Sequence, residues 1–156
     1  MKIFLTFLIG MTVFLGCESK SGDSGSAAAV VANPLIGTWQ LVSGSTIRGK
    51  DTTTTDYTKG KKFLKIINAT HFAFVGHDLN KGMDSLKFYS SGAGTYTLKD
   101  SSYTEHLQFC SDRNWEGNDF SFTIVINNDS LTQTGIEKVE KININQLNIE
   151  RYVRVK

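Results

Sequence analysis

The chain has 156 residues, of which 40% are hydrophobic and 21% are charged. Its 17 Lys and Arg residues nearly balance 15 Asp and Glu residues, and no basic run is interleaved with aromatic side chains. Because nucleic-acid binding needs a basic face, we expect no nucleic-acid partner. The length corresponds to a single domain after its N-terminal segment.

The first sixteen residues have the pattern of a secretory signal peptide. Lys2 supplies a positive charge, and residues 3–15 form an apolar stretch that is too short for a permanent membrane span of about 20 residues. The end of this stretch, Phe14-Leu15-Gly16-Cys17, resembles a bacterial lipobox. The resemblance implies that Cys17 becomes the first mature residue and carries the acyl chains that anchor the protein in a membrane.

Residues 17–34 are expected to form a flexible tether, because a segment rich in Ser, Gly and Ala cannot bury enough apolar area to become ordered. Pro34 is the only proline and suits the start of an edge strand. We therefore expect the folded domain over residues 35–156. If Cys17 is lipidated, Cys110 has no partner for an intramolecular disulfide and is expected to be a buried small hydrophobic residue.

Short runs of β-branched and aromatic residues alternate with turn clusters along the domain, and no long 3.6-residue period competes. Strands are expected over residues 38–47, 63–68, 71–75, 86–98 with an interruption at 92–94, 103–110, 120–127, 130–134 and 146–155. Residues 48–60, 76–84 and 111–119 are expected to be loops. The alternation assigns three sets of residues to common strand faces: Trp39, Leu41 and Ser43; Tyr103, Glu105, Leu107 and Phe109; Phe120, Phe122, Ile124 and Ile126.

These eight antiparallel strands, joined mostly by hairpins, predict an all-β fold. An up-and-down barrel would remove the exposed edges and would have room inside for side chains or one small ligand. A two-sheet Greek-key sandwich shows the same alternation and stays open as the alternative.

Gly37-Thr38-Trp39 resembles the Gly-x-Trp signature that opens the first strand of lipocalins and other calycin barrels. In that family the tryptophan closes one end of the barrel, and an arginine near the last strand covers its ring. The resemblance implies this role for Trp39 together with Arg151 or Arg154. A guanidinium group over an indole face contributes about 0.5–2 kcal/mol.

The domain is also similar to the lipocalin-like domain of small bacterial outer-membrane and periplasmic lipoproteins. Four stretches carry this resemblance over residues 35–156: Leu35-Ile36-Gly37-Thr38-Trp39, Gly94-Thr95-Tyr96-Thr97, Tyr103-Thr104-Glu105 and Glu150-Arg151-Tyr152-Val153-Arg154. Tyr152 stands where tryptophan is commoner in that family. The resemblance implies an eight-stranded antiparallel up-and-down barrel anchored in the cell envelope, with the outer membrane as the expected location, and it does not identify a ligand.

Six residues are candidates for a polar cluster inside the barrel: Tyr96, Tyr103, Glu105, Glu150, Tyr152 and Arg154. A carboxylate at Glu105 that faces inward must be paired or protonated, since burial of an isolated charge is very costly. One interpretation is a ligand anchor, as when fatty-acid-binding proteins hold a carboxylate with an arginine and a tyrosine. The other is an internal salt bridge beside the cover of Trp39, because such networks also occur for structural reasons.

No motif of the chain indicates catalysis, a cofactor or a metal. The three histidines lack the convergent spacing of a metal site, and neither a nucleophile elbow nor a phosphate-binding glycine loop is present. We expect no enzymatic activity. Asp84-Ser85-Leu86 and Asp129-Ser130-Leu131 resemble an O-glycosylation sequon of exported bacterial proteins, and whether they are modified stays open.

We therefore expect a lipid-anchored envelope lipoprotein whose barrel binds a small apolar or amphipathic ligand. This hypothesis predicts an internal cavity of about 300 Å³ or more. The alternative is a structural or interaction module of the envelope with a filled barrel and no ligand, which predicts an exposed apolar patch for an envelope protein partner.

Overall fold

A computed structural model describes residues 33–83 and 87–156. The expected signal peptide, Cys17, most of the tether and Asp84-Ser85-Leu86 lie outside the described residues. The described strands are β1 (Gly37–Arg48), β2 (Asp51–Asp56), β3 (Lys61–Ile67), β4 (His71–Asp78), β5 (Tyr89–Lys99), β6 (Ser102–Cys110), β7 (Asn118–Asn127), β8 (Ser130–Val139) and β9 (Ile144–Arg154). Two 3₁₀ helices, η1 (Arg113–Trp115) and η2 (Glu140–Ile142), complete the described elements. None of the described helices has the length and hydropathy that a membrane crossing requires.

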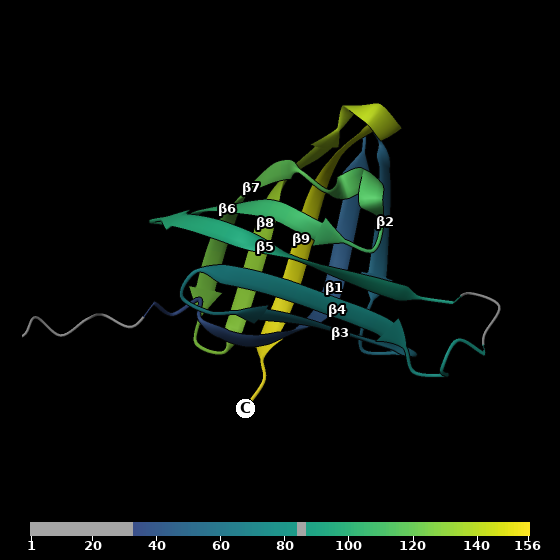
Figure 1. Cartoon of the computed structure of the whole chain (residues 1–156). Coiled ribbons are helices and arrows are strands. Elements are labelled where there is room, and N and C mark those ends of the chain that lie inside the picture. Colours follow the sequence, from purple (N-terminus) through teal and green to yellow (C-terminus); the bar gives the residue numbers. More distant parts are fainter. Residues whose placement is uncertain (1–32, 84–86) are drawn as a thin grey trace, which may run out of the picture. The chain divides into compact units, whose positions relative to one another are not determined.

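The strands form a closed antiparallel barrel. Each strand from β3 to β8 pairs with the next one along the chain, and β1 pairs with β3 on one edge and with β9 on the other. In Figure 1, β8 and β9 are seen through the barrel behind β4 and β5. The predicted eight-stranded barrel is confirmed, and the sandwich alternative is wrong, because pairing β1 with β9 closes the sheet and removes its open edges.

The additional strand β2 corrects the expectation of a loop over residues 48–60. It forms a hairpin with the second half of β1, in which Thr46 pairs with Thr53 and Arg48 with Asp51. Four consecutive threonines, Thr52 to Thr55, occupy this strand, and β-branched residues favour extended backbone. Two strands are longer than expected: residues 76–78, which were expected in a loop, complete β4, and β8 extends beyond its expected end at residue 134 to Val139.

Two β-bulges overturn two of the face assignments. The register between β1 and β9 shifts after Leu41, so Ser43 pairs with the exposed Arg151 instead of facing the core. A second shift between β5 and β6 leaves Phe109 65% exposed. One extra residue in a strand inverts the inward and outward alternation beyond it. Where no bulge intervenes the prediction is confirmed, since Phe120, Phe122 and Ile124 are all buried.

One end of the barrel is closed around Trp39, which is fully buried. Its indole N–H donates to the Leu35 carbonyl at 2.8 Å, and the Arg154 guanidinium lies 4.1 Å from the ring centroid. The two Arg154 nitrogens Nη1 and Nη2 donate to the carbonyls of Ile36 (2.9 Å) and Pro34 (2.6 Å). Of the two candidate arginines, Arg154 covers the ring and ties down the incoming chain.

Glycine at position 37 makes this cover possible. Its φ of +146° is rarely adopted by other residues, and a Cβ atom there would lie 2.5 Å from Nη1 of Arg154. The ordered turn before it begins at Asn33, whose Oδ1 accepts from the Leu35 backbone N–H at 3.0 Å. Asn33 and Pro34 therefore belong structurally to the barrel end, although the composition groups them with the tether.

Candidate ligand-binding cavity

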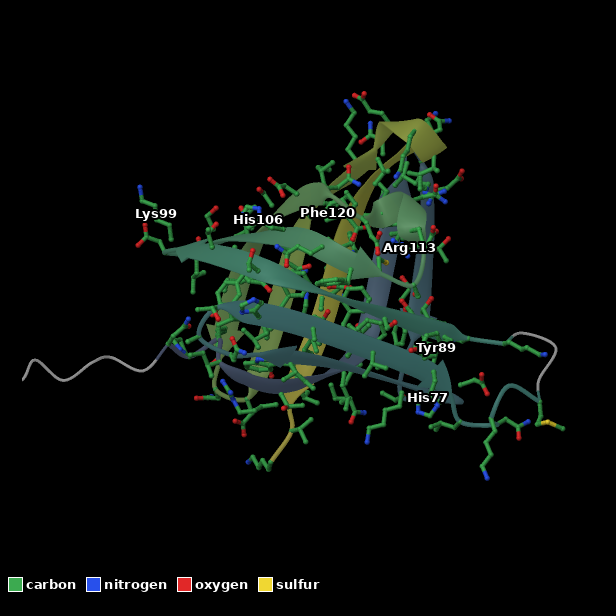
Figure 2. The ribbon with its side chains drawn as sticks, in the orientation of Figure 1. His77, Tyr89, Lys99, His106, Arg113 and Phe120 are labelled. Carbon is green, nitrogen blue, oxygen red and sulfur yellow. The ribbon has the colours of Figure 1, made fainter. Side chains whose placement is uncertain are left out.

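A cavity of about 410 Å³ lies inside the barrel. It is lined by the late residues of β1, β6 and β8 and by the first residues of β5, so it opens at the end of the barrel that is opposite to Trp39. Figure 2 shows Tyr89 and Arg113 near this open end and Lys99 at the other end. Its apolar wall consists of six residues, namely Phe63, Phe74, Leu107, Trp115, Phe120 and Phe122.

The strand register builds the aromatic part of this wall. Phe63 and Phe74 from β3 and β4 stack with their ring centroids 5.6 Å apart. Gly92 on β5 pairs with Phe74, and a Cβ atom at Gly92 would lie 2.4 Å from Cζ of that ring. The glycine thus lets the Phe74 ring lie flat against the backbone of β5, which keeps the centre of the barrel open.

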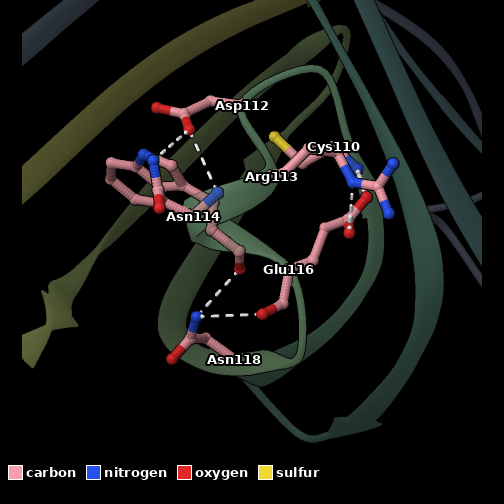
Figure 3. A network of polar contacts seen from close by, with 7 residues as sticks. Cys110, Asp112, Arg113, Asn114, Glu116 and Asn118 are labelled. Carbon is pink, nitrogen blue, oxygen red and sulfur yellow. Dashed lines mark hydrogen bonds and ion pairs between the residues drawn. The ribbon is translucent and has the colours of Figure 1, made fainter. Parts of the chain in front are cut away.

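The loop between β6 and β7 forms one side of the cavity mouth, and a polar network holds it in place (Figure 3). The Glu116 carboxylate accepts from the Cys110 backbone N–H (2.9 Å) and from Nε of Arg113 (2.7 Å). These two contacts lower the pKa of Glu116. Asp112 Oδ1 accepts from the Asn114 backbone N–H at 3.1 Å. The network fixes η1 and with it Trp115, which lines the mouth. The ring centroids of Trp115 and Phe120 lie 5.7 Å apart.

The floor of the cavity is a buried ion pair between Lys65 and Glu105. Lys65 Nζ donates to the Glu105 carboxylate and to Oε1 of Gln133 at 2.9 Å. The ammonium also lies 5.6 Å from the Tyr152 ring centroid and 5.7 Å from that of Tyr103. Burial raises the pKa of Glu105, and the charge of Lys65 opposes this rise. Of the two expected outcomes for a buried Glu105, pairing or protonation, the structure shows pairing, with Lys65 as the partner.

Two further carboxylates, Glu137 on β8 and Glu150 on β9, line the cavity above this floor, and we call them the acidic pair. The Glu137 oxygens accept from the side-chain amides of Gln146 (2.7 Å) and Asn148 (2.8 Å). Glu150 accepts from the Tyr152 hydroxyl at 2.7 Å. Burial and the nearby charge of Glu150 raise the pKa of Glu137 to about 7, although its two hydrogen bonds oppose the rise. Glu137 therefore changes its charge close to neutral pH.

The six candidate residues from the sequence do not form one cluster. Glu105, Glu150 and Tyr152 line the cavity, whereas Arg154 lies on the Trp39 end. Tyr96 donates from its hydroxyl to the Asn68 carbonyl at 2.7 Å and does not line the cavity. The separation follows from strand direction: β9 runs the length of the barrel, so its last residues reach the closed end.

Tyr103, the remaining candidate, is fully buried beside the floor. Within the part of the chain that the structure describes, its hydroxyl is the buried side-chain atom without a hydrogen bond of good geometry. Burial, together with the nearby Glu105 charge, raises the pKa of this hydroxyl. Tyr103 thus remains a neutral member of the core and contributes mainly its ring.

The sequence analysis did not identify several polar residues of the cavity, including Lys65, Gln133 and Glu137. A signal for Lys65 was present, because it alternates with the buried Phe63 and Ile67 along β3. Glu137 gave no such signal, because it lies beyond residue 134, where the seventh strand was expected to end. Its inward position depends on the extension of β8 to Val139.

We predict that Glu137→Gln changes the pH dependence of stability. The carboxyl pKa rises from 4.5 to about 7 on folding, so ionisation of Glu137 progressively destabilises the fold as the pH rises between these values. Relative to the unsubstituted protein, the variant should gain about 1–3 kcal/mol between pH 5 and pH 8. Denaturant unfolding at both pH values measures this. Glu140→Gln, at an exposed position, is the control, and parallel pH profiles for Glu137→Gln and the unsubstituted protein would contradict the assignment.

Among residues 33–83 and 87–156, no group of three or more His, Cys, Asp or Glu side chains is placed to hold a metal ion. His106 Nδ1 lies 2.8 Å from the Asp119 carboxylate in a partly exposed pair. In the second sequon, Ser130 is exposed at the start of β8, and Asp129 pairs with Lys156 at 2.9 Å.

No protein-family model matches the chain, and a search of curated proteins finds no significant match.

Proposed function

We propose that this protein binds one small amphipathic ligand inside a lipocalin-like barrel. The observation that supports this proposal best is the cavity of about 410 Å³, which falls in the range of small-molecule sites. Its aromatic wall suits an apolar body, and its polar floor suits a head group. A filled barrel would leave no such space, so the cavity favours binding over a purely structural role.

Binding without catalysis is part of this proposal. Lys65 and Glu105 are engaged with each other and with Gln133, which leaves neither side chain free to act as a general acid or base. The interaction module remains the second candidate because apolar side chains near the mouth are exposed, with Tyr89 at 68% and Met83 at 81%. Such side chains can contact an envelope protein partner as well as a ligand.

A neutral fluorescent probe, N-phenyl-1-naphthylamine, tests the binding proposal. It should bind the protein with one site, and Ser90→Trp should weaken binding about 10-fold or more because Ser90 lines the cavity. Thr97→Trp on the same strand is the control, since Thr97 is exposed and should leave binding unchanged. Absence of probe binding, together with native mass spectrometry that shows no bound small molecule, would contradict the proposal.

We further propose that the barrel is attached to the outer membrane through acyl chains on Cys17, as the lipobox resemblance implies. Cys17→Ser should abolish acylation and move the protein from the membrane fraction to the soluble fraction, because several acyl chains are needed for stable anchoring. Mass spectrometry of the mature N-terminus together with fractionation measures this. An unmodified Cys17 in the wild-type protein, or unchanged membrane retention of the variant, would contradict it.

A further inference from the structure

The described residues that line the cavity carry an excess of negative charge. Lys65 is the only cation among them, whereas the carboxylates of Glu105, Asp112, Glu137 and Glu150 lie along the same walls. The charge that a ligand meets depends on which of these groups already neutralise one another.

Lys65 is not available to an incoming anion. Its side chain is 3% exposed, and its ammonium is bonded to the Glu105 carboxylate and to the Gln133 amide oxygen. The faces of the aromatic rings around it, including that of Tyr152, take up the remaining space. Lys65 and Glu105 therefore neutralise each other at the floor.

The acidic pair above the floor is not neutralised in this way. The hydrogen-bond donors to Glu137 are the amides of Gln146 and Asn148, and the donor to Glu150 is the Tyr152 hydroxyl, all of which are uncharged. None of the ion pairs found among the described residues includes Glu137 or Glu150. Both side chains are partly buried, and a carboxylate that is partly removed from water without a cation is unfavourable. A ligand cation would relieve this cost.

The cations that the described neighbouring elements carry do not form an ion pair with either carboxylate. Arg48 on β1 donates from Nε to Oε1 of Gln146 at 2.7 Å. It therefore binds the side-chain amide that donates to Glu137 and forms no ion pair with Glu137 itself. Tyr57, between β2 and β3, remains a neutral phenol, because burial and the charges of Glu150 and Glu137 raise its pKa. Its ring lines the cavity and already attracts one cation of the protein, since Lys61 Nζ lies 5.7 Å from the ring centroid.

From this charge distribution we infer that the ligand of the cavity is an amphipathic organic cation, such as a primary alkylamine. Its ammonium group would lie between Glu137 and Glu150, and its apolar body would lie against the aromatic wall of the cavity. This differs from the interpretation in which an arginine and a tyrosine anchor a ligand carboxylate, because Arg154 lies on the closed end. The inference rests on the proposed binding function, and it adds the chemical class of the head group.

A matched series of ligands tests the proposed binding function and the inferred positive head group separately. Octylamine, octanol and octanoate share the same chain and differ in charge, and each can be titrated into the full chain by calorimetry and by displacement of N-phenyl-1-naphthylamine. At pH 8 octylamine should bind at least about 10-fold more tightly than octanol. Octanoate should bind most weakly, since its carboxylate would lie beside the like charges of the acidic pair, which is strongly unfavourable. Binding of octanoate that equals or exceeds that of octylamine would overturn the inference and leave the proposed function intact.

Variants and pH give an independent readout. Glu150→Gln and Glu137→Gln should each remove most of the preference for the amine, whereas Asp100→Asn, in the exposed β5–β6 turn, should not. Octylamine affinity should rise from pH 5.5 to pH 8 as Glu137 ionises, and Glu137→Gln should abolish this rise. An amine preference that survives both cavity variants would overturn the inference. Binding of the neutral probe without displacement by octylamine would also overturn it, whereas failure of the probe and all three ligands to bind would overturn the proposed function as well.

Discussion

Replacement of Lys65 by methionine should lower the free energy of unfolding by about 3–5 kcal/mol, because it leaves the buried Glu105 carboxylate without its partner. Glu105→Gln should have a loss of similar size, since it leaves the Lys65 ammonium buried among aromatic rings. The loss in Lys65→Met should shrink as the pH falls towards 4.5, where the carboxyl is protonated in the unfolded chain as well. Denaturant unfolding at pH 5 and pH 8 measures these changes.

The double variant K65M/E105M is the decisive comparison. Replacing both members of a buried ion pair with apolar residues of similar volume is often neutral or stabilising, so the double variant should recover at least half of the loss in either single variant. Lys138→Met serves as the control, because Lys138 pairs with Glu140 on the exposed surface, and this variant should show no measurable change. If the losses in the two single variants were simply additive, the pair would not be coupled as described.

Trp39→Ala should also destabilise the protein strongly, by about 3–5 kcal/mol. The side chain is fully buried, and its removal leaves a cavity, frees the Leu35 carbonyl and exposes the Arg154 guanidinium to an empty space. Trp39→Phe should cost less, about 1–2 kcal/mol, because a ring remains but the hydrogen bond to Leu35 is lost. Thermal and denaturant unfolding measure both variants.

The chain contains one other tryptophan, which provides the matched comparison. Trp115 is only partly buried at the cavity mouth, so Trp115→Ala should cost about 1 kcal/mol. The same variant should weaken binding of the neutral probe, whereas Trp39→Phe should leave it unchanged because Trp39 does not line the cavity. Equal losses of stability in Trp39→Ala and Trp115→Ala would refute the role of Trp39 as the closing residue.

The pattern of single residues along the chain was sufficient to predict most of the strands, but it left a barrel and a sandwich open. The resemblance of Gly37-Thr38-Trp39 to the calycin signature favoured the barrel. Alternation with a period of two is a local property of an extended chain with one buried face, so Phe120, Phe122 and Ile124 were assigned correctly. The assignments of Ser43 and Phe109 were wrong because a bulge inserts one residue, and no local pattern reveals it. Strand β2 was missed because a run of threonines and acidic residues carries no buried face.

For the site, the sequence by itself determined only that an inward-facing Glu105 must be paired or protonated, because burial of a lone charge is too costly. Only the tertiary structure decided that its partner is Lys65, 40 positions away in the chain, that Arg154 covers Trp39, and that Glu137 joins Glu150 at the cavity. The first contact crosses the barrel from β3 to β6, the second joins β1 and β9, and the third lies between the neighbouring strands β8 and β9. Their positions depend on strand register and closure, which all the strands determine together and which no local stretch of residues contains.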